Sequence, residues 1–136
     1  MLTIERLQIF LKVFAIAPMT AIFAAMLPVD VMDRVHRLIG LGPLPEGPIV
    51  VYLARSTSLF YALHGVLLWY LASDLRRYAA LFRFYLRVSL LFAVGIFLTD
   101  LTAGLPPRWT YAEGPFVAAF VVLVMWMFRV AESRSA

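Results

Sequence analysis

The chain has 136 residues, of which 63% are hydrophobic and 15% are charged, and its mean hydropathy is +0.88. A soluble domain of this size cannot hide so much apolar surface, because the ratio of surface to volume rises as proteins become smaller. The chain has no cysteine, which excludes disulfides, thiol relays and thiolate-bound metal sites. The net charge of +4 would suit nucleic acid in a soluble protein, but the arginines here lie beside apolar segments, which is typical of membrane topology.

Four segments are long enough to cross the hydrocarbon core of a membrane, which requires roughly 20 mostly apolar residues per helix. They cover approximately residues 9–27, 49–72, 81–101 and 112–130. The first follows a basic residue, as in a signal peptide, but no small-x-small cleavage site comes after it, so we expect a retained helix. The sequence therefore predicts an all-α integral membrane protein, a four-transmembrane-helix bundle in a single membrane domain.

The connection between the first two segments predicts a short helix over about residues 30–39. Apolar residues recur there at helical spacing and charged residues take the opposite face. Asp30 suits the start of this helix and Gly40 suits its end. The pattern fits a helix that lies in the membrane interface, and it fits equally well an ordinary surface helix that caps the bundle.

Basic residues predict the orientation of the segments in the membrane. On one side lie Arg6, Lys12, Arg76, Arg77, Arg83, Arg87, Arg129 and Arg134. The other side has only Arg34, Arg37 and Arg108, while Arg55 lies inside the second segment. We therefore expect both termini in the cytoplasm and the first and third connections outside.

The tripeptide Glu-Gly-Pro occurs twice, at residues 46–48 and 113–115. Leu-Lys-Val at residues 11–13 likewise resembles Leu-Arg-Val at residues 86–88. Because two membrane segments separate the copies, both copies have the same orientation in the membrane, as in transporters built from parallel repeats. The sequence therefore predicts two parallel-repeat hairpins. Convergent capping also explains the motif, since proline suits a first helical turn and glutamate there complements the helix dipole. Either interpretation places both motifs at outer helix ends.

Arg55 is a charged side chain inside the second apolar segment, roughly 9 Å below its outer end. A long side chain at that depth can extend to the interface, which would be a purely structural role. Otherwise an arginine within the membrane pairs with an acidic side chain. Asp100 is the first candidate and Glu113 the second, and Glu46 could replace either. With Tyr52 these residues form a candidate outer-leaflet cluster, read either as an ion pair that joins the hairpins or as a polar pocket.

His64 lies deeper, roughly 22 Å along the second segment, and shares a helical face with Tyr61. This pair is a candidate intramembrane ligand or packing site, through a hydrogen bond to a neighbouring helix, a quinone carbonyl or haem. Haem is disfavoured because the only other histidine, His36, lies in the outer connection. We expect packing first and quinone second. Neither a metal-spaced cluster nor a recognised catalytic motif is present in the sequence.

The chain resembles the DoxX-like group of small four-span bacterial membrane proteins. The resemblance rests on its length, its four short-looped helices and a polar residue such as Arg55 early in the second segment, and it includes no specific motif. It implies a bacterial inner-membrane location. Because some members are linked to redox or quinone-associated complexes, it also implies quinone or another small lipid as a ligand.

The most direct functional prediction is a non-catalytic accessory or assembly subunit of a larger membrane complex. The chain offers almost no extramembrane mass and no nucleotide site, which leaves lateral helix packing as its principal surface. The expected partners are membrane lipids and other transmembrane subunits or a second copy of the chain, without nucleic acid. The alternative is a redox-associated membrane protein that binds quinone or a small lipid.

Overall fold

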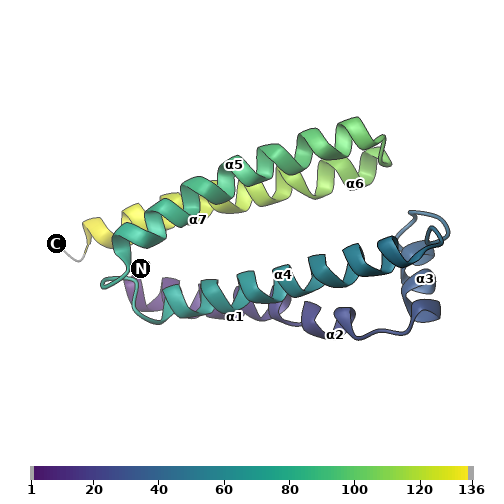
Figure 1. Ribbon diagram of the computed structural model, residues 1–136. Coiled ribbons are helices and arrows are strands. Elements are labelled where there is room, and N and C mark those ends of the chain that lie inside the picture. The colour runs from purple at the N-terminus through teal and green to yellow at the C-terminus, as the bar shows by residue number, and fades with distance from the viewer. Residues whose placement is uncertain (1, 135–136) are drawn as a thin grey trace. The chain divides into compact units, whose positions relative to one another are not determined.

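A computed structural model describes residues 2–134, which form helices and no strand (Figure 1). The helices are α1 (Ile4–Met19), α2 (Ala21–Ala25), α3 (Val29–Leu38), α4 (Pro48–Ser73), α5 (Ala79–Ala103), α6 (Pro107–Ala112) and α7 (Gly114–Ser133). The prediction of an all-α protein is confirmed.

Four stretches of helix are long and apolar enough to cross a membrane, as the sequence predicted. They cover Ile4–Ala25, Pro48–Ser73, Ala79–Ala103 and Pro107–Ser133. Each begins before the range expected from its apolar run, because helix starts are set by caps and prolines as well as by hydropathy, and all but the first also end after it. The fourth stretch shows this most clearly, since Pro107 begins the helix five residues before the expected start.

Prolines interrupt the first and fourth stretches. Pro18 has no N–H to donate within the helix, and α1 ends one residue later, at Met19. Thr20 then separates α1 from α2, and its hydroxyl donates to the carbonyl oxygen of Ala17 at 2.7 Å. Pro115 has the same effect in the fourth stretch, where Glu113 (φ −83°, ψ −77°) separates α6 from α7.

The contacts divide the chain into two units. The first unit comprises Phe10–Ser73, and the second comprises Met1–Ile9 together with Asp74–Ala136. In the first unit α2 packs along α4, and in the second α5 packs along α7, with α6 contacting both (Figure 1). The second unit thus contains a pair of long helices, whereas in the first the long α4 packs along the five-residue α2.

A glycine allows close helix packing in each unit. A Cβ atom added to Gly65 on α4 would lie 2.8 Å from the carbonyl oxygen of Ala15 and 2.7 Å from Cγ of Met19. One added to Gly114 on α7 would lie 2.9 Å from the carbonyl oxygen of Ala93 on α5. Small residues at such contacts are typical of membrane helices, which associate through close packing rather than through the hydrophobic effect.

The two Glu-Gly-Pro motifs adopt different conformations. Gly47 has φ +125° and lies outside α4, which begins at Pro48. Gly114 has no positive φ, is buried, and begins α7 directly after α6. The first motif therefore marks the start of a helix, as predicted. The second marks the start of α7, but the prolines at 106 and 107 start the fourth stretch six residues upstream of Glu113.

The helix expected near residues 30–39 is α3, and the loop after it folds back on it. The N–H of Gly40 (φ +82°) donates to the carbonyl of Arg37, and that of Leu41 donates to the carbonyl of His36, as in a Schellman motif. Asp33 Oδ1 then accepts a 2.8 Å hydrogen bond from the N–H of Leu44. The connection between α2 and α4 is thus a compact cap.

Candidate functional site

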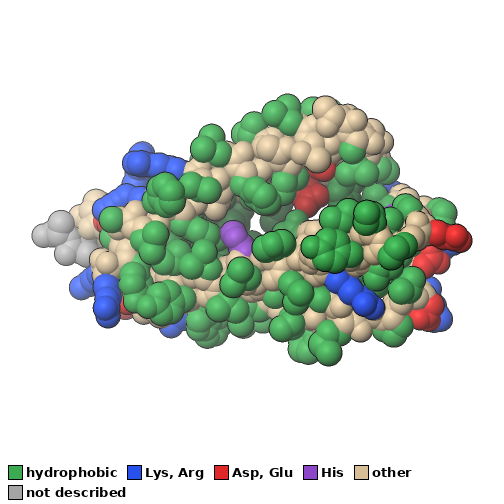
Figure 2. Space-filling model, viewed as in Figure 1, with side chains coloured by type: hydrophobic (Ala, Val, Ile, Leu, Met, Phe, Trp, Pro, Cys, Tyr) green, Lys and Arg blue, Asp and Glu red, His purple; other side chains and the backbone are tan. Residues whose placement is uncertain are grey.

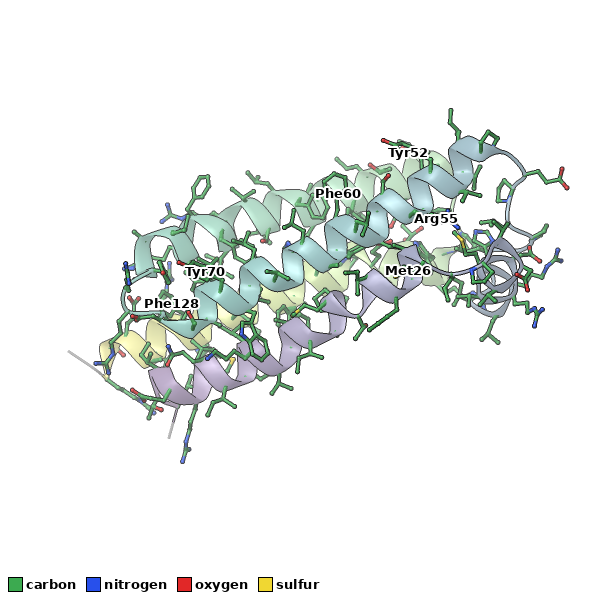
Figure 3. The ribbon with its side chains drawn as sticks, turned by 60° about the horizontal axis from the view of Figure 1, so that its bottom comes forward. Met26, Tyr52, Arg55, Phe60, Tyr70 and Phe128 are labelled. Carbon is green, nitrogen blue, oxygen red and sulfur yellow. The ribbon has the colours of Figure 1, made fainter. Side chains whose placement is uncertain are left out.

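Arg55 contacts the end of the first apolar stretch. Its Nη2 atom donates to the carbonyl oxygen of Leu27 at 3.3 Å. Figure 3 shows Arg55 on the side of α4 that faces Met26 and the end of α2. Leu27 lies two residues after the end of α2, where the helical hydrogen-bond pattern has stopped, so the guanidinium supplies a donor for its carbonyl oxygen. This bond explains a charged side chain early in α4 without any carboxylate.

The two remaining candidates in the first unit, Tyr52 and Glu46, are both exposed. Tyr52 lies on α4 one turn before Arg55, and Glu46 lies two residues before the helix begins. Within the described part of the first unit, no ion pair joins Glu46 to Arg55. These two residues lie at the N-terminal end of α4, and the expected cluster with Arg55 stays a prediction.

Asp100 is the buried carboxylate of the second unit. Only 5% of its surface is exposed, and its Oδ2 atom has no hydrogen-bond partner among the described residues. Its backbone carbonyl is satisfied by the N–H of Leu105 at 3.2 Å, where the left-handed Gly104 ends α5. A buried acceptor without a donor costs roughly 1–3 kcal/mol, and more if it is charged. Asp100 is therefore the group whose environment most needs a donor.

Glu113 lies at the break between α6 and α7 and is half-buried. Its backbone N–H donates to the carbonyl of Trp109 at 3.0 Å, which continues the α6 pattern to its last turn. Arg55 belongs to the first unit, whereas Asp100 and Glu113 belong to the second. The expected ion pair between Arg55 and either carboxylate stays a prediction.

His64 and Tyr61 lie in the middle of α4, and both are exposed. The buried residues of the same turns are Ala62, Gly65 and Leu68, which form the packing face of the helix. Tyr61 lies one turn before Gly65 and His64 one turn before Leu68, so both border this packing face without being buried in it. Residues 2–134 contain no group of three or more histidine, aspartate or glutamate side chains able to hold a metal ion.

Comparison with protein-family models, with curated proteins and with solved structures gives no match for this chain. The DoxX-like resemblance stays a prediction.

Sequence reasoning missed a hollow between α5 and α7, with a volume of about 60 Å³. It is lined by Arg83, Leu86, Arg87, Met125, Phe128, Arg129 and Glu132. The available signal was the spacing of Arg83 and Arg87, which are four residues apart and so share one helix face. On the sequence alone these arginines indicate topology. Their convergence with Arg129 depends on how α5 and α7 are aligned.

Asp33 on α3 accepts two hydrogen bonds, and these lower its pKa. Its Oδ2 atom accepts a 2.8 Å bond from Nε of Arg37, one turn later on α3. The side chain of Arg37 and then the N–H of Leu44 lower the pKa of Asp33 below its ordinary value. These two bonds tie the polar face of α3 to the loop that follows it.

Proposed function

We propose that this protein is a non-catalytic accessory or assembly subunit that packs against, and stabilises, a larger membrane complex. The observation that supports this is the low burial of its apolar helices. In the most apolar 18-residue segment of each of the four stretches, between 11% and 28% of the residues are buried within the chain. The remaining faces are available to lipid and to other transmembrane helices.

Polar groups on these helices would give the lateral contacts their specificity. Between membrane helices, small residues allow close approach and polar side chains form hydrogen bonds across the interface. Gly65 and Gly114 already serve the contacts inside the chain. Asp100 supplies an acceptor with an unused oxygen, which a donor on another helix would satisfy. That donor is Arg55 of the same chain or a donor on the partner subunit.

The proposal includes a specific placement in the membrane. We place both ends of the chain in the cytoplasm of a bacterial inner membrane, on the basis of the distribution of arginines. α3 lies in the interface, where its exposed apolar residues would meet the boundary between headgroups and acyl chains; Leu38 is 85% exposed. The two hairpins descend from a parallel duplication. Because the two Glu-Gly-Pro motifs have different conformations, the duplication concerns the helices and not the structure of these motifs.

The test is purification from native membranes in a mild detergent, with mass spectrometry of the proteins and small molecules that accompany the chain. We expect a partner in constant stoichiometry. Asp100→Asn retains the shape of the side chain and removes its charge, and should reduce recovery of that partner at least several-fold. Asp74→Asn, an exposed change outside the helices, serves as the control. A solitary chain that carries quinone or another small lipid would overturn the subunit proposal in favour of ligand binding.

A further inference from the structure

We propose that the hollow between α5 and α7 binds the phosphate group of an anionic phospholipid. The site belongs to the second unit alone and is independent of the subunit proposal. Three arginines and one glutamate line it, which leaves a net charge of +2. Figure 2 shows Lys and Arg side chains gathered at the end of the molecule where α5 begins and α7 ends.

One arginine is held in place by the protein. Nη1 of Arg83 donates to Oε1 of Glu132 at 3.3 Å, and its guanidinium lies 5.7 Å from the ring centre of Phe128. Phe128 is 2% exposed and packs edge-to-face against Phe82 at 5.1 Å. The aromatic pair forms a rigid base for Arg83, and the ion pair with Glu132 connects α5 to α7.

The other two arginines are available to a ligand. Among residues 2–134, neither Arg87 nor Arg129 has an ion-pair or hydrogen-bond partner, and both are exposed. A guanidinium matches phosphate geometry with two parallel N–H groups, which makes arginine the preferred residue for such groups. The volume of the hollow is several times the roughly 10–15 Å³ that one water molecule needs, so a small polar group can enter.

The depth of the site favours a lipid over a free anion. α5 has 25 residues and is roughly 37 Å long, whereas the hydrocarbon core is about 30 Å thick. Arg83 and Arg129 each lie four residues from a helix end, or roughly 6 Å, which corresponds to the boundary between headgroups and acyl chains. Basic pockets between helices at this level are typical sites for anionic headgroups.

The surface below the arginines suits acyl chains. Leu91 lies one turn deeper than Arg87 on α5 and is 73% exposed. Trp126 lies one turn deeper than Arg129 on α7 and is 59% exposed. A phosphate at the hollow would therefore have apolar side chains along the path of its acyl chains, which a free phosphate ion would not use.

The test measures lipid binding to the detergent-purified full chain by native mass spectrometry, with phosphatidylglycerol and phosphatidylcholine as probes. The unaltered protein should prefer phosphatidylglycerol. In Arg87→Gln/Arg129→Gln this binding should fall roughly a hundredfold, since each substitution removes a charge-assisted hydrogen bond to the phosphate, a loss on the order of tenfold. Arg77→Gln/Arg134→Gln removes the same charge at the same end of the second unit but leaves the hollow intact, so binding should stay close to that of the unaltered protein.

Three outcomes would overturn the proposal. An equal loss in both double variants would mean that general surface charge attracts the lipid. Equal binding of the two lipids would mean that the hollow does not recognise an anion. If millimolar inorganic phosphate displaced phosphatidylglycerol, and the length of the acyl chains did not change lipid binding, the site would be one for a free anion. If the double variant at the hollow does not fold, Arg129→Gln alone should show a roughly tenfold loss.

Discussion

Gly65 and Gly114 determine how closely the helices approach within each unit. At both positions the nearest atoms to an added methyl group include a backbone carbonyl oxygen, which cannot move aside without moving its helix. Gly95 on α5 differs, because nothing lies within 4 Å of its Cβ position. The same substitution should therefore have opposite effects at these sites.

We expect Gly65→Ala to destabilise the first unit by about 1–3 kcal/mol, the usual cost of overpacking a tight contact. Gly95→Ala should be neutral or stabilising by up to about 1 kcal/mol, because alanine favours helix and the site is open. Thermal unfolding in one detergent, followed by circular dichroism, compares the two variants. A melting temperature for Gly65→Ala equal to that of Gly95→Ala would mean that the close contact with Ala15 and Met19 does not limit stability.

The cap of the first unit shows how one helix organises the loop after it. Asp33 accepts bonds from both Arg37 and the N–H of Leu44, so a single carboxylate fixes the helix face and the returning chain. Asp30 makes a similar pair with Arg34 at 3.0 Å but, within the described part of the chain, accepts no bond from the loop. Substituting Asp30 removes only an ion pair within α3, whereas substituting Asp33 also removes a hydrogen bond to the loop.

The lowered pKa of Asp33 predicts how this cap depends on pH. Its contribution is fully present above the unfolded pKa near 3.9 and is lost as the pH falls through the lower folded pKa. Hydrogen exchange at the N–H of Leu44 should accelerate over that acidic range. At neutral pH, Asp33→Asn should accelerate it several-fold, whereas Asp30→Asn should leave it unchanged. Exchange that is equally slow in both variants would show that another contact holds the loop.

At the scale of elements, helix existence was predictable from the sequence and helix contacts were not. Long apolar runs and the two faces of α3 identified the four stretches and the cap helix. The partner of Arg55 was not predictable, because it is a backbone carbonyl at Leu27 and every residue has one. The hollow at Arg87 and Arg129 likewise depends on the alignment of α5 with α7, which helical periodicity within each segment does not specify.

At the scale of the whole molecule, the basic residues give the strongest signal of orientation. Two of them form ion pairs within the second unit: Arg76 with Glu5 at 3.5 Å and Arg83 with Glu132 at 3.3 Å. These pairs should not weaken the signal, because acidic residues contribute little to topology and lysine and arginine determine it. The side that carries the connection between α4 and α5 should therefore be cytoplasmic.

The chain has no cysteine, so a single introduced thiol reports the location of one site without background. Pro45 lies in the connection before α4, Ser73 ends α4, and both are exposed. We expect Pro45→Cys to react with a membrane-impermeant maleimide in intact cells and Ser73→Cys to react only after lysis. Equal labelling of both variants in lysed cells is the control for reactivity. The reverse pattern would invert the topology, and would move the arginine-lined hollow to the outer leaflet without changing the residues that form it.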